Sequence, residues 1–178
     1  YFKNYDFHNL YKELLNFCTV DLSAFYFDIR KDVLYCDPKS SKKRESTIIL
    51  LNIILNSLLR WFAPILTFTT EEIFRLISNE NKSIHLEKFM NFPKNFINED
   101  LSKKWFEIIK IRNVCNISIE EKRATKEIGS SLEASLEIEM NEKNLELIGN
   151  IDLAEICITS LAEIKKTNSN EIIVKTTK

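Results

Sequence analysis

Helix-breaking residues are scarce in this chain, and their scarcity constrains its fold more than any other feature. Its 178 residues include two glycines and three prolines, whereas 44% of the residues are hydrophobic. Glycine and proline mark most turns and helix ends, so a chain with few of them favours long helices. A chain of this length and apolar content buries the core of one large domain, or of a domain with a smaller appendix. We therefore expect a globular, mainly α-helical protein.

An apolar stripe of helical period runs through the N-terminal part of the chain. Its members lie three or four residues apart, as in an amphipathic helix, and are Phe7, Tyr11, Leu14, Cys18, Leu22, Phe25 and Ile29. The stripe predicts one long helix with Phe25 in the core, or two nearly collinear helices. Two helices would meet near Thr19 and Asp21, either of which can cap the second. Asp37 ends the pattern, because a residue before proline is disfavoured in the α region.

Two further helical segments complete the first half. The stretch from Ile48 to Phe62 is apolar almost all round, which is typical of a central helix buried in a bundle. Pro64 kinks or ends this helix. Thr69 and Glu72 then have the spacing of a capping box, with which a new helix begins. Residues 1–92 therefore predict an antiparallel bundle of about four helices.

The hydrophobic period changes in residues 93–178. Within a connector over 78–100, Ile84 to Leu86 is expected to be a short extended piece. A long helix is expected from Leu101 to Lys126, and Gly129 is placed to end it.

A small α+β subdomain is predicted after this helix. From Leu132 to Met140, apolar residues alternate with polar ones, mostly glutamates, which indicates a half-buried strand with an acidic outer face. A short helix over Glu142–Ile148 and two strands, Ile156–Ser160 and Ile172–Lys175, are expected to follow. The subdomain would thus be a sheet of about three strands packed on the long helix.

The composition argues against several functions. A phosphate-binding glycine loop needs more glycines than Gly129 and Gly149. His8 and His85 are expected to be solvated, and the four cysteines lack metal-binding spacing, which fits a reducing cytosol. We therefore predict no catalytic residue, no metal site and no cofactor in this chain. A membrane span is not expected, because polar residues interrupt the most apolar stretch at Asn52, Asn56, Ser57 and Arg60.

A local group of cations is the strongest functional signal, although the formal net charge is −1. It consists of Arg30, Lys31, Lys39, Lys42, Lys43 and Arg44. One interpretation is a solvated helix end, in which Asp28 and Asp32 flank the cations. The other is a surface that follows the phosphates of a nucleic acid, with Tyr35 offering a ring to an unpaired base. Both interpretations remain open at this point.

Four segments, in the same order, resemble the anticodon-binding region of bacterial-type isoleucyl-tRNA synthetases, which are class I enzymes. They are YDFHNLYKELLNFCTVDLSAFYFDIRKDVLYCD (Tyr5–Asp37), RWFAPILTFTTEEIF (Arg60–Phe74), SIHLEKF (Ser83–Phe89) and IGSSLEASL (Ile128–Leu136). The amino-acid sequences of the first and last segments favour the isoleucyl type over the related valyl and leucyl types, which remain an alternative. The resemblance implies a helical anticodon-binding bundle over residues 1–92 and an α+β junction region over 93–178.

The resemblance also implies a partner, cofactors and a location. The chain would be a C-terminal piece of a longer isoleucine–tRNA ligase, cytoplasmic and monomeric, whose catalytic site uses ATP and Mg²⁺ on another domain. The partner would be the anticodon stem-loop of isoleucine tRNA. From charge and placement, we assign Arg30 and Lys31 to the anticodon or its flanking phosphates, and Tyr35 to stacking. Lys42, Lys43 and Arg44 would hold the stem backbone. A different class of function, a helical protein–protein interaction module with an acidic β face, is the remaining alternative.

Overall fold

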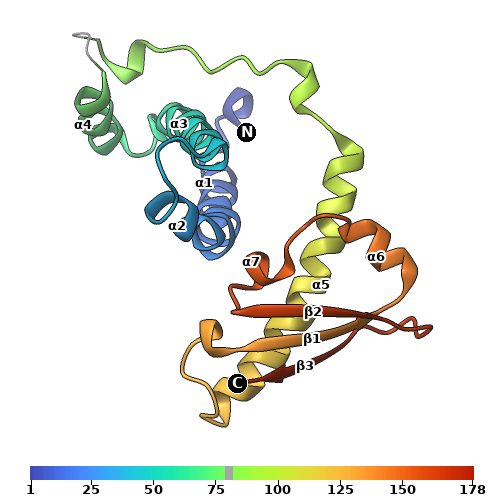
Figure 1. Cartoon of the computed structure of the whole chain (residues 1–178). Coiled ribbons are helices and arrows are strands. Elements are labelled where there is room, and N and C mark those ends of the chain that lie inside the picture. Colours follow the sequence, from blue (N-terminus) through green and yellow to red (C-terminus); the bar gives the residue numbers. More distant parts are fainter. Residues whose placement is uncertain (79–81) are drawn as a thin grey trace. The chain divides into compact units, whose positions relative to one another are not determined.

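The computed structural model describes residues 1–78 and 82–178, which divide into two compact units (Figure 1). Unit 1 is Tyr1–Pro93 and unit 2 is Lys94–Lys178. Unit 1 is helical, and unit 2 combines helices with a three-stranded sheet. The predicted fold class, a helical bundle followed by a small α+β subdomain, is confirmed.

Unit 1 begins, after the short 3-10 turn Phe2–Asn4, with an uninterrupted helical path of three elements. These are α1 (Phe7–Asn16), a π-helical stretch (Phe17–Phe27) and α2 (Asp28–Tyr35). Asp6 caps the start by accepting a hydrogen bond from the Asn9 amide at 3.2 Å. The backbone does not break at Thr19, whose hydroxyl donates to the Leu15 carbonyl instead. The interpretation as one long helix therefore holds, but Phe25 is only half-buried.

The next helix, α3 (Lys42–Phe62), begins at Ser41, whose hydroxyl accepts a hydrogen bond from the Arg44 amide. The sequence predicts that it is buried all round, and this prediction is wrong. Ile48, Ile49 and Leu50 are 40%, 54% and 40% exposed. By length and composition alone, α3 is the one helix in the described ranges that would suffice to cross a membrane, although core helices of soluble proteins meet the same criterion.

The last helix of unit 1, α4 (Thr67–Ile77), contributes to a small core. This core consists of Leu59, Ala63, Phe74 and Ile84. The predicted capping box is wrong, because α4 begins two residues before Thr69 and no side chain caps it. Ile84–Leu86 is a single 3-10 turn and not an extended piece. Part of the predicted connector, 79–81, lies outside the described residues.

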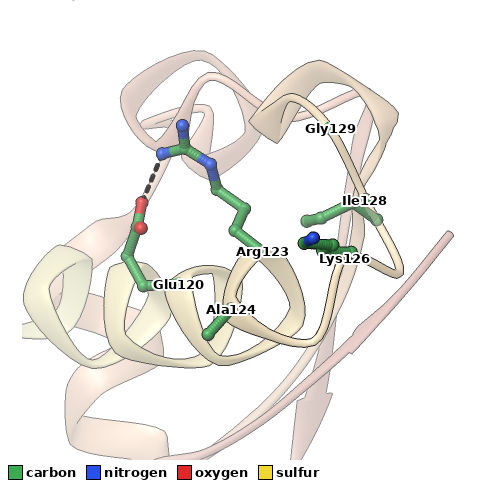
Figure 2. A pocket seen from close by; sticks show the side chains of 6 residues that line it. All are labelled: Glu120, Arg123, Ala124, Lys126, Ile128 and Gly129. Atoms are coloured by element: carbon green, nitrogen blue, oxygen red, sulfur yellow. Dashed lines mark hydrogen bonds and ion pairs between the residues drawn. The ribbon is translucent and has the colours of Figure 1, made fainter.

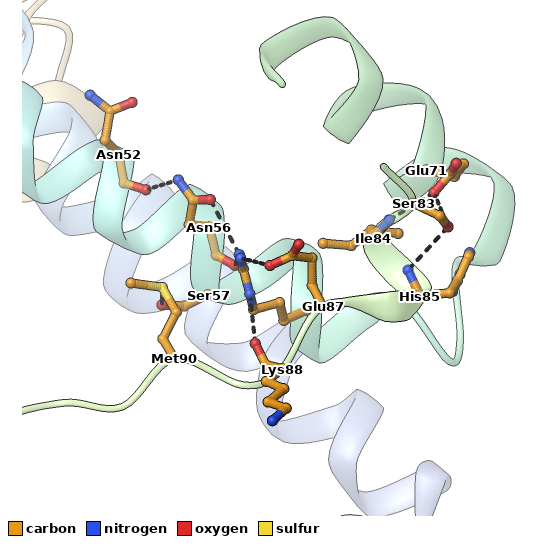
Figure 3. Close-up of polar contacts among 11 residues, drawn as sticks. Asn52, Asn56, Ser57, Glu71, Ser83, Ile84, His85, Glu87, Lys88 and Met90 are labelled. Carbon is orange, nitrogen blue, oxygen red and sulfur yellow. Dashed lines mark hydrogen bonds and ion pairs between the residues drawn. The ribbon is translucent and has the colours of Figure 1, made fainter. Parts of the chain in front are cut away.

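Polar side chains hold the connector against α3 and α4 (Figure 3). The guanidinium of Arg60 donates to the Glu87 carboxylate and the Lys88 carbonyl, both at 2.9 Å, and to the Asn56 carbonyl at 2.8 Å. The carboxylate of Glu71 accepts from the Ser83 hydroxyl at 2.8 Å and from the Ile84 amide at 2.9 Å. These bonds join two of the segments that carry the family resemblance, since Arg60 and Glu71 lie in one and Glu87 lies in the other.

Unit 2 is built from α5 (Glu99–Ala124), which follows the short turn Lys94–Phe96, and a sheet of order β2-β1-β3 (Figure 1). The central strand β1 (Ser135–Met140) is parallel to β2 (Leu161–Lys166) and antiparallel to β3 (Ile173–Thr177). The short turn Ser131–Glu133 leads into β1, and α6 (Glu142–Ile148) and α7 (Leu153–Cys157) connect β1 to β2. The core includes Ile111, Cys115, Ile119, Leu136, Ile138, Met140, Ile148 and Cys157.

Two local predictions in unit 2 are wrong. The helix α5 ends five residues before Gly129, and Lys126 takes the left-handed conformation after it with φ 59°. The predicted strand Ile156–Ser160 is the end of α7 and a turn. Asp152 starts α7 by accepting from the Ala154 amide, and Ile158 leaves it in the left-handed conformation. The strand therefore begins only at Leu161.

Candidate nucleic-acid interface

Three of the predicted cations line one pocket of unit 1, with a volume of about 340 Å³. They are Arg30 from α2 and Lys42 and Lys43 from the first turn of α3. The remaining lining residues are Tyr26, Ser46, Thr47 and Leu50. We call this site the α2–α3 pocket.

Helical spacing explains why these residues share the α2–α3 pocket. On α3, Lys42, Ser46 and Leu50 are four residues apart and therefore lie on one face. On the opposite wall, Tyr26 and Arg30 have the same spacing, and the Arg30 guanidinium carbon lies 5.9 Å from the centroid of the Tyr26 ring. This distance is within the range of a cation–π contact. The pocket thus combines positive charge with a flat ring.

Lys42, Lys43 and Arg44 outnumber Glu45 in the first turn of α3, so the net charge there favours an anion. Lys42 and Lys43 are exposed there, and the free amides of a helix N-terminus add partial positive charge. Within the two described ranges, Lys42 forms no ion pair. Its ammonium group is therefore available to a phosphate.

The other three predicted residues lie outside the pocket lining. Arg44 donates from its Nε to the Leu34 carbonyl at 3.1 Å, so it ties the end of α2 to the start of α3. Lys31 pairs with Asp28 at 2.5 Å, and this hydrogen bond raises the pKa of Lys31 above its ordinary value. Tyr35 is 85% exposed. The structure therefore places Arg44 in a positioning contact, and Lys31 and Tyr35 on the solvent side of α2.

Sequence reasoning did not assign Tyr26, Ser46, Thr47 or Leu50 to the site. The available signal was the four-residue spacing that links Tyr26 to Arg30 and Ser46 to Lys42. That spacing indicates a shared helix face, but only the tertiary contact of α2 with α3 turns two faces into one pocket.

Unit 2 has a larger open pocket of about 510 Å³ at the end of α5 (Figure 2). Its charged side chains have both signs, and Arg123 donates to the Glu120 carboxylate at 2.6 Å. The C-terminal carbonyls of a helix also carry partial negative charge, which opposes a phosphate. Among residues 1–78 and 82–178, no group of three or more His, Cys, Asp and Glu side chains is placed to hold a metal ion.

Comparison with known proteins now identifies the class. The family model described as the anticodon-binding domain of tRNA ligase matches residues 1–138, and the chain belongs to this family. Its relatives narrow the assignment to one kind of ligase. Over all 178 residues, the chain is 67% identical to the isoleucine–tRNA ligase of Pelagibacter ubique. The corresponding protein of Bartonella henselae is 44% identical over 164 residues, and that of Agrobacterium fabrum 42% over 157 residues.

The resemblance to isoleucyl-tRNA synthetases is thereby confirmed. The chain is covered almost completely in these comparisons, at 100%, 92% and 88%. It spans only about a fifth of the length of these relatives, at 20%, 17% and 16%.

Proposed function

We propose that this chain binds the anticodon stem-loop of isoleucine tRNA as part of a longer isoleucine–tRNA ligase. The observation that carries the proposal is the convergence of Arg30, Lys42 and Lys43 beside Tyr26 in the α2–α3 pocket. Cations position RNA through its phosphates, and an aromatic ring offers a stacking face to an unpaired base. Anticodon bases are unpaired in a loop, so their edges and faces are accessible.

Each candidate residue has a role in this proposal. Arg30 contacts the anticodon or its flanking phosphates from within the pocket, and Lys42 and Lys43 hold the backbone. Lys31 and Tyr35 extend the surface on the solvent side of α2. Arg44 acts mainly by holding α2 against α3, since its Nε is bonded to the Leu34 carbonyl.

The longer protein supplies the chemistry in this proposal. It is an isoleucine–tRNA ligase that uses ATP and Mg²⁺, works in the cytoplasm and is monomeric. Unit 1 is its anticodon-binding bundle, and unit 2 is a junction region. In this division of roles, no residue of the chain takes part in the ligase reaction.

The protein–protein alternative loses part of its support in the structure. It depends on an acidic face of β1, yet the Glu137 carboxylate accepts a hydrogen bond from the Lys165 ammonium at 3.0 Å. Lys175 also lies opposite Glu137 on β3. The outer face of the sheet therefore carries charges of both signs.

Replacement of the pocket cations tests the proposal. The double variant Lys42→Ala/Lys43→Ala should weaken binding of an isoleucine-tRNA anticodon stem-loop at least 10-fold, because two phosphate contacts are lost. Both side chains are exposed, so the helical circular dichroism spectrum and the melting temperature should hardly change. Lys12→Ala, which removes an exposed cation of α1, is the matched control and should bind normally. Equal binding by the double variant and the control would refute the proposal.

A further inference from the structure

We propose that the α2–α3 pocket holds a single unpaired nucleotide, with its base against Tyr26 and Leu50 and its phosphate beside Lys42 and Lys43. This inference rests on the proposed function and adds to it a particular pocket, a ligand of defined size and an orientation for that ligand. None of the four residues Tyr26, Ser46, Thr47 and Leu50 belongs to the cationic surface predicted from sequence.

The α2–α3 pocket is a small depression that is open to solvent. At about 340 Å³, it lies near the lower end of the range in which proteins bind small molecules. A stem of paired bases is far wider than this depression, which therefore matches one unpaired nucleotide better than a duplex. Only an unpaired nucleotide can leave its stack to enter such a pocket.

The polarity of the pocket changes along α3 in the way that a nucleotide requires. Lys42 and Leu50 are eight residues apart, which corresponds to about 12 Å along the helix. Cations stand at the Lys42 end, a hydroxyl group of Ser46 lies midway, and the apolar Leu50 is at the other end. A phosphate, a ribose hydroxyl and a base follow one another in the same order along a nucleotide.

The opposite wall offers a stacking surface. The Tyr26 ring presents a face of π electrons, and the Arg30 guanidinium lies 5.9 Å from its centroid. A planar guanidinium stacks on a base as an aromatic ring does. Ser46 is exposed, whereas the Thr47 hydroxyl already donates to the Lys43 carbonyl at 2.8 Å. Ser46 is therefore the hydroxyl group available to the ribose.

A binding cycle that combines RNA and protein variants tests the inference. In the RNA, the bases of the anticodon loop are removed one at a time, leaving the sugar and the phosphate. In the protein, Ser46→Trp fills the pocket from an exposed helix position. Ile49→Trp adds the same ring to α3 at a position that is 54% exposed and does not line the pocket.

With the wild type and Ile49→Trp, removal of the base at one loop position should weaken binding about 10-fold, as for one base stacked on an aromatic side chain. With Ser46→Trp, removal of that base should not change the affinity for the stem-loop, and the affinity should still depend on salt as in the wild type. The inference is overturned if base removal weakens binding equally in all three proteins at every position. A further outcome is that the wild type binds stem-loops with the isoleucine anticodon and with a changed anticodon equally, while Ser46→Trp still abolishes the effect of removing one base. In that case the proposed function fails and the nucleotide pocket stands.

Discussion

Loss of the Arg60 guanidinium should destabilise unit 1 strongly. The Arg60 side chain is 13% exposed and the Glu87 side chain 28% exposed. Water therefore compensates only in part for the loss of this ion pair. A hydrogen bond to a charged group contributes about 1.5–3 kcal/mol, and each bond to a carbonyl about 1 kcal/mol. Arg60→Met keeps much of the side-chain stem but loses the bonds to Glu87, Lys88 and Asn56. Allowing for partial hydration of Glu87, we expect the free energy of unfolding of unit 1 to fall by about 3 kcal/mol.

The assay is urea unfolding followed by fluorescence. Trp61 lies in unit 1 and Trp105 in unit 2, so a Trp105→Phe background leaves a reporter for unit 1 alone. For a unit of this size, 3 kcal/mol corresponds to a fall in melting temperature of about 12–20 °C. Arg75→Met is the matched control, because its ion pair with Glu71 is formed within one helix and Arg75 is 70% exposed. If both variants lost similar stability, or if Arg60→Met lost less than about 1 kcal/mol, the reasoning would be refuted.

Three further predictions concern pH, the core of unit 2 and the end of α5. Hydrogen bonds from Ser83 and Arg75 lower the pKa of Glu71 below its ordinary 4.5. Its stabilisation is therefore complete above pH 4.5 and is lost as the pH falls through the lowered pKa, so Glu71→Gln should flatten the acid side of a plot of melting temperature against pH. Leu136→Ala, at a fully buried position, should lower the free energy of unfolding of unit 2 by about 3 kcal/mol in urea titrations; a loss below 1 kcal/mol would contradict the packing. Lys126→Gly should raise that free energy by about 0.5 kcal/mol, because Lys126 has a positive φ; a decrease would contradict this reasoning.

Much of the fold follows from hydrophobic periodicity. The stripe that includes Leu14, Leu22 and Ile29 predicts the first helical path, and the alternation of Leu136, Ile138 and Met140 with polar residues predicts β1. Burial is harder to predict, because it depends on neighbours that are distant in the sequence. The exposure of Ile48 to Leu50 in α3 is the clearest example. Hydropathy shows that these side chains are apolar, but it does not show what covers them.

Helix ends and short strands depend on local conformations that the sequence signals only weakly. Gly129 was the natural candidate to end α5, yet Lys126 takes the left-handed position despite its side chain. The β-branched residues Ile156, Ile158 and Thr159 suggest a strand, but Asp152 caps a short helix that ends at Cys157. The residue at which a helix begins or ends depends on capping hydrogen bonds of about 1 kcal/mol, and tertiary packing readily outweighs them.

The candidate site was predicted in part, because cations that lie close in sequence also lie close in space. Arg30, Lys42 and Lys43 come together as their density in the sequence suggests. The distinct role of Arg44 was not predictable, since its partner is the carbonyl of Leu34, ten residues earlier on another helix. Charge alone does not separate a cation that faces a ligand from one that holds two helices together.

The central claim is that this chain recognises the anticodon of isoleucine tRNA, and a comparison of two stem-loops tests it most directly. Binding of the isoleucine-tRNA anticodon stem-loop is measured over a salt series beside a stem-loop that differs only in its anticodon. We predict tighter binding of the isoleucine stem-loop at every salt concentration, and affinities for both that fall steeply with salt as phosphate contacts are screened. Equal affinity for the two stem-loops, or binding that does not depend on salt, would contradict the claim.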